Sequence, residues 1–202
     1  MPHELRVCAE TEKSDYAFLR IFLPAGNDLV TFRIQLLRYG RSFRNASRPD
    51  SMNNINLPPE VDFHEDIPLF IYRPRGLLNE ASVDRAVRVL EELEAKLKEP
   101  FDRFSDASAI DGVELNYQYV IQVSLYRVLT YADRPPVKSA ILTTDSTIGH
   151  YFQLHAIITQ DSPINVRIFR EREDAAKWLR VPIERLAPKS VADSQSNLEE
   201  TK

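Results

Sequence analysis

The chain has 202 residues and a formal net charge of −4, with 26 Lys and Arg against 30 Asp and Glu. This length allows one domain of ordinary size with extensions. Its single cysteine cannot form an internal disulfide, and no apolar run approaches the roughly 20 residues that a membrane-spanning helix needs. No secretory signal is recognisable either, so we expect a cytoplasmic protein without a transmembrane segment.

Composition divides the chain into four parts. Residues 1–51 carry 8 basic against 6 acidic side chains, whereas the remainder carries 18 against 24. Residues 52–60 are rich in Asn and Pro, which is typical of a linker. Residues 187–202 are rich in Ser, Gln and Glu without periodicity, which predicts a disordered tail. The folded domain is therefore expected to span residues 61–186.

The N-terminal part, residues 1–51, has two interpretations. Ala17–Leu23 and Leu29–Leu37 are apolar enough for two strands of a β-ribbon, with a turn at Gly26-Asn27-Asp28, and such a ribbon is marginal by itself. Alternatively, translation begins at Met52 and the preceding residues are an over-extended start. Under either interpretation, we expect this part to add little to the stability of the domain.

Nucleic-acid binding is not expected. It requires a concentrated basic face, and the part of the chain after the linker is acidic. The one basic cluster lies in the N-terminal extension, where a solvated arm is the simplest interpretation. Its members are Arg33, Arg38, Arg41, Arg44 and Arg48.

Strand-like and helical patterns alternate after the linker. Short β-branched or aromatic runs predict strands at Val61–His64, Ile67–Arg73, Phe101–Asp106, Val137–Thr143 and Ile164–Phe169. Apolar residues at helical spacing predict helices from Asn79 to Pro100, Asp111 to Thr130, Asp145 or Ser146 to about Ile158, and Glu173 to Leu179. This alternation predicts an α/β sandwich with a parallel or mostly parallel sheet.

The ends and faces of these helices carry further signals. Asn79 is a good N-cap for the first helix, and Asp111 with Glu114 resembles a capping box that opens the second. The glutamates and arginines of the first helix are expected on its outer face, opposite a periodic apolar stripe. In the last helix, Trp178 is expected to be a core anchor because Ala175 and Leu179 share its face.

Three segments resemble the STAS superfamily, specifically its SpoIIAA-like branch (STAS/SEC14-like domain). They are Leu69-Phe-Ile-Tyr-Arg-Pro-Arg-Gly76 with Leu77-Leu78 after it, Val137-Lys-Ser-Ala-Ile-Leu142, and Val166-Arg-Ile-Phe169 followed by Ala175-Ala-Lys-Trp-Leu179. The similarity covers roughly Val61 to Pro182. It implies a four- or five-stranded mostly parallel sheet with about four helices mainly on one face. It further implies a protein of bacterial type with a non-enzymatic role in protein association or in binding a small or lipophilic ligand.

A phosphorylation switch is not expected at the position where the resemblance would place it. Anti-sigma-factor antagonists of the superfamily carry a phosphorylatable serine in an Asp-Ser-Ser-Gly-Leu element at the start of the second helix. The matching stretch is Asp111-Gly-Val-Glu-Leu115, which keeps the aspartate and leucine but has no hydroxyl. Ser105 and Ser108 lie upstream, and serines at strand ends usually cap the local backbone.

Two classes of function follow from these patterns. The first is a protein-interaction or regulatory domain, with a protein partner or a second copy of the chain. Its surface would be the loops at the strand ends, carrying Ser105, Asp106, Ser108, Asp111, Glu114, Thr144 and Ser146. The alternative is a carrier or sensor of a small lipophilic ligand in an aromatic-lined pocket between the helices and the sheet. The expected lining of that pocket includes Tyr117, Ile121 and Phe152.

Catalysis, metal binding and cofactor binding are not expected. The sequence has no Gly-x-Ser-x-Gly elbow and no Gly-rich phosphate loop. His150 and His155 share the third helix at a spacing of five, which places them about 140° apart around its axis. Helical zinc pairs use a spacing of three or four, so these histidines are expected to be surface or packing residues.

Overall fold

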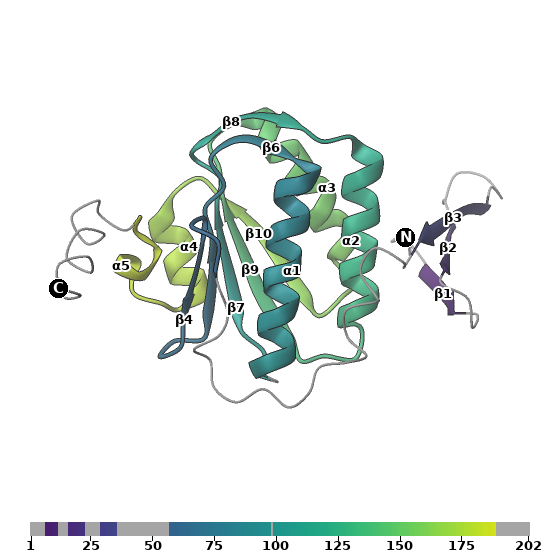
Figure 1. The fold of residues 1–202 in the computed structure, drawn as a ribbon, viewed down its shortest axis with the longest axis horizontal. Helices are drawn as coiled ribbons and strands as arrows, with labels where there is room; N and C mark the ends of the chain where they lie inside the picture. Colours follow the sequence, from purple (N-terminus) through teal and green to yellow (C-terminus); the bar gives the residue numbers. More distant parts are fainter. Residues whose placement is uncertain (1–6, 12–15, 23–28, 36–56, 98, 189–202) are drawn as a thin grey trace, which may run out of the picture.

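The computed structural model describes residues 7–11, 16–22, 29–35, 57–97 and 99–188. A five-stranded sheet forms the centre of the part from residue 57 onward (Figure 1). β4 pairs antiparallel with β5, and all other neighbours in this sheet are parallel. The strand order is β10 (Ile164–Phe169), β9 (Val137–Leu142), β7 (Asp102–Asp106), β5 (Leu69–Tyr72) and β4 (Val61–His64). The predicted α/β fold with a mostly parallel sheet is confirmed.

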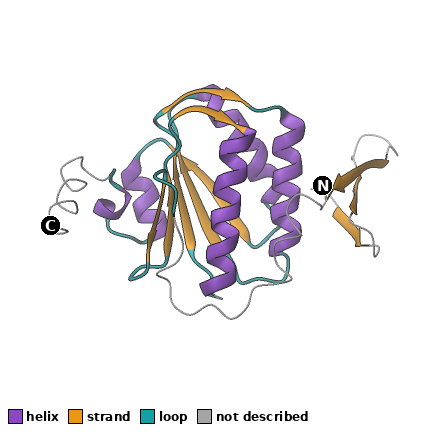
Figure 2. Ribbon diagram, viewed as in Figure 1, coloured by secondary structure: helices purple, strands orange, loops and turns teal. Residues whose placement is uncertain are grey.

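Helices cover both faces of this sheet (Figures 1 and 2). The three long helices α1 (Glu80–Leu97), α2 (Tyr117–Tyr131) and α3 (Ser146–Thr159) lie on one face. The short helices α4 (Arg172–Leu179) and α5 (Ile183–Leu186) lie on the other. The helices are therefore mainly on one face, as expected, and α5 is an addition that the sequence pattern did not indicate.

Strand residues alternate between these two helical layers, as the pleat of a strand requires. Leu69 and Ile71 of β5 pack in one apolar cluster with residues of α4 and α5. Phe70 and Tyr72 of the same strand pack in another cluster with α1. The cluster on the α4 side consists of apolar residues only. Trp178 packs against this core and tilts toward Phe169 at 5.5 Å between ring centroids, but it is only half-buried.

The start of the second helix was predicted wrongly. Residues Ile110–Glu114 form a strand, β8, which pairs in parallel with β6 (Gly76–Asn79) at the top of Figure 1. Helix α2 begins at Tyr117 instead, and Asn116 caps it by accepting a hydrogen bond from the Tyr119 backbone N–H at 2.7 Å. Gly112 is a poor helix former, and a strand partner in β6 was available to this segment.

Asp111 and Glu114 are therefore exposed strand residues and not a capping box. The comparison of Asp111-Gly-Val-Glu-Leu115 with a helix-start phosphorylation element also fails on this ground. The predicted cap Asn79 is confirmed, and of the two residues expected at the start of the third helix, Asp145 and Ser146, Asp145 is the cap. The Asn79 side chain accepts from the Ser82 backbone N–H at 3.0 Å, and the Asp145 side chain accepts from the Ile148 N–H at 2.9 Å. Both are side-chain oxygens satisfying donors of a first helical turn.

The N-terminal extension contains three strands that pair only with one another in the described sheets. They are β1 (Val7–Thr11), β2 (Tyr16–Phe22) and β3 (Leu29–Gln35), in an antiparallel sheet of that order. β2 and β3 coincide with the two strands expected from the sequence, whereas β1 was not expected. The proposed turn at Gly26-Asn27-Asp28, the arginines from Arg38 to Arg48, Met52 and residues 189–202 lie outside the described residues. Among the described helices, none combines the length and apolarity needed to cross a membrane.

Candidate functional site

A cavity of about 170 Å³ lies between the three long helices and the sheet. Most of its lining is apolar and comes from every surrounding element, including Leu78, Val87, Leu115, Val120, Ile141 and Phe152. Nine further lining residues carry polar or charged groups, namely Tyr72, Arg103, Ser105, Tyr119, Ser124, Arg127, Ser139, Tyr151 and His155. For scale, an engineered apolar cavity of about 150 Å³ holds one benzene molecule.

The charged groups of this cavity lie toward one end of it. Arg103 near the start of β7 is the register partner of Ser139 near the start of β9, so the two lie side by side on the cavity face. Arg127 lies in the last turns of α2, which runs back toward that same end of the sheet. Leu78 and Leu115 lie near the opposite, carboxyl end of the strands. The two arginines thus lie toward the amino ends of the strands, here called the polar end of the cavity, and Leu78 and Leu115 lie toward the carboxyl ends.

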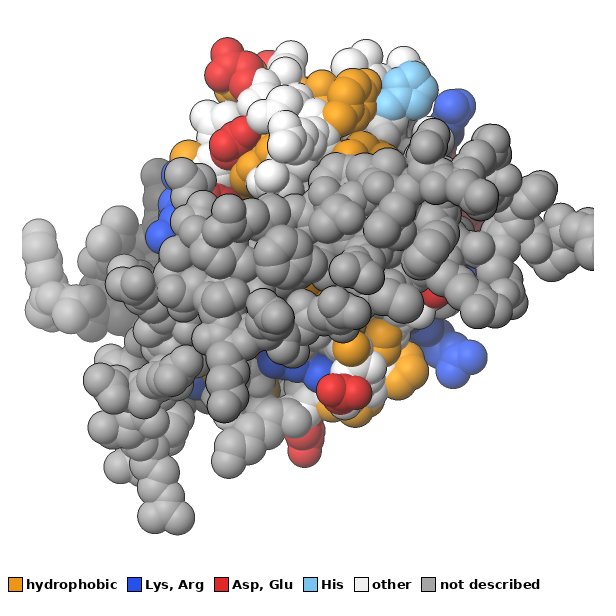
Figure 3. All heavy atoms as spheres, turned by 90° about the vertical axis from the view of Figure 1, so that its right-hand side faces the viewer, with side chains coloured by type: hydrophobic (Ala, Val, Ile, Leu, Met, Phe, Trp, Pro, Cys, Tyr) orange, Lys and Arg blue, Asp and Glu red, His pale blue; other side chains and the backbone are white. Residues whose placement is uncertain are grey.

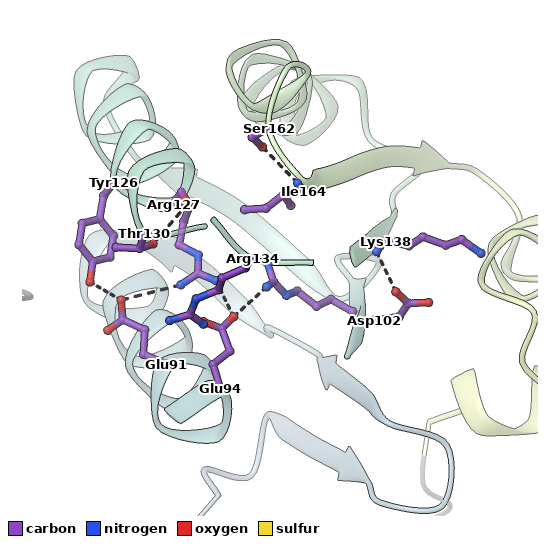
Figure 4. A network of polar contacts seen from close by, with 11 residues as sticks. Glu91, Glu94, Asp102, Tyr126, Arg127, Thr130, Arg134, Lys138, Ser162 and Ile164 are labelled. Atoms are coloured by element: carbon purple, nitrogen blue, oxygen red, sulfur yellow. Dashed lines mark hydrogen bonds and ion pairs between the residues drawn. The ribbon is translucent and has the colours of Figure 1, made fainter. Parts of the chain in front are cut away.

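One buried carboxylate organises the polar end. Glu94 of α1 accepts a hydrogen bond from Arg103 Nη2 at 2.7 Å and from Arg127 Nη2 at 2.6 Å, both on Oε1. Its other oxygen accepts from Arg134 Nη1 at 2.9 Å. Figure 4 shows Arg127 and Arg134 converging on Glu94 from the end of α2. Glu94 was expected on the outer face of α1; instead it is buried and joins three elements.

A second carboxylate, Glu91, lies one turn earlier on α1. It accepts a short hydrogen bond from Tyr126, and Arg127 Nη1 is 3.8 Å from its Oε1 (Figure 4). Burial raises the pKa of Glu91, against the hydrogen bond from Tyr126 and the charge of Arg127. With both carboxylates ionised, three guanidinium groups face two carboxylates and the cluster carries one surplus positive charge. Protonation of Glu91 would raise that surplus to two.

The arginines also surround one buried aromatic ring. The guanidinium carbons of Arg103, Arg127 and Arg134 lie 4.8, 5.4 and 5.1 Å from the centroid of Tyr131. Cation–π attraction of this kind partly offsets the repulsion between like charges. Burial and, to a smaller extent, the neighbouring charge of Arg127 together lower the pKa of Arg103 to about 10.

Two guanidinium nitrogens of this cluster have no hydrogen-bond acceptor among the described residues. They are Arg103 Nε and Arg127 Nη1, and both are buried. Arg103 is only 6% exposed and Arg127 only 3% exposed. Buried donors that lack an acceptor are uncommon, and each one costs free energy.

His155 forms the third polar feature of the cavity. Its Nδ1 lies 2.8 Å from Ser124 Oγ, which in turn lies 2.7 Å from the Val120 carbonyl oxygen. The single hydroxyl proton goes to that carbonyl, so Nδ1–H of His155 is the donor to Ser124. Although part of the residue is accessible, desolvation and, to a smaller extent, the charges of Arg127 and Arg103 together lower the pKa of His155 to about 4. The imidazole is neutral at pH 7. His150, five residues earlier, is exposed.

The residues predicted to form the interaction surface separate into three groups. Ser105 lines the cavity. Asp106 is buried and accepts from the Ser108 hydroxyl at 2.6 Å and from Arg172 Nη2 at 2.8 Å. The remaining five are exposed at the strand ends, namely Ser108, Asp111, Glu114, Thr144 and Ser146.

Of the three residues predicted to line a pocket, one does. Phe152 lines the cavity. Tyr117 is 55% exposed and stacks on Tyr151 at 5.0 Å between centroids, and Ile121 packs beside Leu125. Sequence reasoning missed the buried arginines altogether. The sequence offered one signal for them. Arg103 is a charged residue inside a short strand, and the residues on either side of it were expected to be covered by helices.

Comparisons with known proteins give one similarity. No protein-family model matches the sequence, and no curated protein matches it. A solved structure from Shewanella loihica PV-4 is similar to the chain with a TM-score of 0.42 and 18% sequence identity. The similarity covers 59% of this chain and 90% of that one. The structure is described as an uncharacterized protein from the DUF3478 family with a SpoIIAA-like fold.

Proposed function

We propose that this protein is a non-enzymatic binding domain that holds a small, largely apolar ligand in the cavity between the sheet and helices α1, α2 and α3. The observation that carries the proposal is the cavity itself, which lies where a closely packed core would otherwise be. Protein interiors are normally packed to crystal density, and a void of this size costs stability. Convergent polar groups within an apolar pocket are typical of a ligand site.

The arrangement of Ser124 and His155 supports binding rather than catalysis. A serine nucleophile needs a base that accepts its proton. Here the hydroxyl proton is directed to the Val120 carbonyl, and the imidazole donates to the same hydroxyl oxygen. The pair therefore fixes the positions of α2 and α3 relative to each other and presents a neutral imidazole to the cavity.

Toluene is a suitable neutral probe because it is close to the cavity in size. We expect it to bind the full chain saturably, with chemical-shift changes in isoleucine, leucine and valine methyl groups that line the cavity. Ala86→Leu places three additional carbon atoms against the cavity and should abolish these changes. The matched control is Ala95→Leu, on the exposed side of the same helix, which should leave binding intact. Equal toluene binding by both variants would place the site elsewhere, and an unmodified chain that binds neither toluene nor any other small aromatic probe would refute the proposal.

A protein-interaction surface is the second candidate. It is favoured by large apolar side chains that remain exposed, namely Leu77 of β6, Tyr117 of α2 and Ile157 of α3. Figure 3, which is turned so that the right-hand side of Figure 1 faces the viewer, shows exposed apolar side chains beside polar ones at the top and at the bottom of the molecule. If this surface joins two copies of the chain, sedimentation should detect a dimer that Tyr117→Ser dissociates. A monomer at all accessible concentrations would exclude that form of the candidate.

A further inference from the structure

We infer that the cavity is built for a small monocarboxylate with an apolar body, whose carboxylate contacts Arg103 and Arg127 at the polar end. This inference rests on the proposed binding function and names the chemical class of its ligand. The apolar body would lie against Leu115, Val120 and Phe152 toward the other end. The cavity volume suits a body of about one benzene ring.

The unused donors of the two arginines carry the argument. Arg103 Nε and Arg127 Nη1 lack hydrogen-bond acceptors among the described residues, and both residues line the cavity while being more than nine-tenths buried. Glu94 occupies the Nη2 nitrogen of each arginine, and the remaining contact of Arg127 Nη1 is the ion pair with Glu91 at 3.8 Å. A ligand oxygen placed between these donors would satisfy groups that the chain leaves unpaired.

Two serine hydroxyls add an independent observation. Ser105 and Ser139 lie on the cavity face of neighbouring central strands, at positions that an apolar core would fill with larger side chains. Within the described part of the chain, neither hydroxyl has a hydrogen-bond partner. Ser139 is the register partner of Arg103, so its hydroxyl lies at the same end of the cavity as the unused guanidinium donors. The cavity therefore offers both charged and neutral donors to one anionic group.

The charge of the cluster selects a monoanion. Three guanidiniums against two ionised carboxylates leave one surplus positive charge, which a carboxylate neutralises. A phosphate monoester, at about −1.5 to −2 near pH 7, would overcompensate that charge inside a poorly solvated site. Burial is the main cause of the lowered pKa values of Arg103 and His155, and the neighbouring arginine charges lower them further; a bound anion would offset that second contribution.

Benzoate and benzyl alcohol make the decisive pair of probes, because they share a ring and differ in charge. Calorimetric titration of the full chain at pH 7 should show benzoate binding at least about tenfold more tightly, since hydrogen bonds to charged groups are stronger than neutral ones. Phenyl phosphate should bind more weakly than benzoate. Equal affinities for benzoate and benzyl alcohol, or a preference for phenyl phosphate, would overturn the inference while leaving the binding function standing. Failure of all three probes and of toluene would remove both.

Substitutions of single arginines test where the carboxylate of the ligand binds. Arg127→Met keeps the aliphatic stem and should abolish the preference for benzoate over benzyl alcohol. Arg134→Met is the matched comparison, because it removes the same charge beside Glu94 at a residue that does not line the cavity, and it should keep part of the preference that Arg127→Met loses. Should Arg127→Met not fold, Arg127→Lys should fold and weaken benzoate more than benzyl alcohol. A preference that survives in either Arg127 variant as it does in Arg134→Met would place the carboxylate elsewhere.

Discussion

The two faces of the central sheet are built from the same strands but in opposite ways. On the α4–α5 face, Leu69, Ile71, Phe104, Ala140 and Leu142 are all buried against Ala175, Ala176, Leu179 and Leu186. On the α1–α3 face, the central strands present Arg103, Ser105 and Ser139 to a cavity. Alternation along single strands separates these two environments. In β7, for example, Arg103 and Ser105 flank Phe104, which points the other way.

This difference assigns different tasks to the two faces. Continuous apolar burial is the usual state of a parallel sheet covered on both sides. The α4–α5 face follows that rule and supplies stability through close packing. The α1–α3 face departs from it, since it buries charged groups that cost desolvation energy and leaves a cavity. A poorly packed region whose cost is offset by the stability of the rest of the fold is typical of a functional site.

Truncation of a core side chain on the α4–α5 face should cause the largest loss of stability. Phe104→Ala removes a ring that is fully buried and should lower the free energy of unfolding by about 4 kcal/mol, within the range for buried aromatic side chains. Urea denaturation followed by circular dichroism measures this. A loss below about 1 kcal/mol, near that of surface changes, would mean that the two faces do not differ in packing as described.

The ion cluster of the opposite face should depend on Glu94. Glu94→Gln leaves Arg103 and Arg127 buried without their carboxylate and should cost about 3 kcal/mol, since breaking a buried ion pair is strongly destabilising. Glu92→Gln, on the exposed side of the same helix, is the control and should change stability by less than about 0.5 kcal/mol. Similar unfolding curves for the two variants would show that Glu94 does not hold the cluster together.

Acid should lower the stability of the folded chain through His155, which lies on the cavity face. Its pKa is about 4 in the folded chain against an ordinary value of 6.5, so below pH 6.5 the unfolded chain binds a proton that the folded chain does not. The resulting stability is complete above pH 6.5 and is lost as pH falls toward 4. From pH 6.5 to about pH 5, the loss should be about 2 kcal/mol, at 1.36 kcal/mol per pH unit.

The comparison for this effect is His155→Gln, which cannot titrate. The raised pKa of Glu91 acts in the opposite direction, because the folded chain then holds its proton more tightly, but it is present in both proteins. Urea titrations at the two pH values should therefore give a shallower acid dependence for the variant than for the unmodified chain. Parallel pH dependences would show that His155 titrates normally.

The smallest effect is expected at the N-terminus. Strands β1–β3 pair with one another and not with the central sheet in the described structure. A chain that begins at Met52 should therefore melt within about 1 °C of the full chain, well below the 2–4 °C that 1 kcal/mol shifts a domain of this size. A melting temperature lower by several degrees would make the N-terminal strands part of the folded unit.

Sequence reasoning worked where local physics decides the structure. The five strands of the central sheet and the caps Asn79 and Asp145 follow from apolar patterns and from short polar side chains at helix starts. It failed at Ile110–Glu114, where a capping-box pattern competed with a strand whose partner, β6, lies more than 30 residues earlier. Pairing at that distance leaves no local signal.

The candidate site was harder to predict for a related reason. In the sequence, Glu91 and Glu94 cannot be told apart from glutamates on the exposed side of a helix. They are buried because three arginines surround them in the folded chain, namely Arg103, Arg127 and Arg134. An ion cluster drawn from α1, β7 and the end of α2 is visible only once the chain is folded. Phe152 was predicted correctly because an aromatic residue on an apolar helix usually faces the interior.

A crystal structure of the full chain grown with saturating benzoate tests the central claim most directly. The account predicts benzoate in the cavity, with its carboxylate oxygens within hydrogen-bonding distance of Arg103 Nε and Arg127 Nη1 and its ring against Phe152. A cavity that holds only water, or benzoate bound only at the molecular surface, would contradict it.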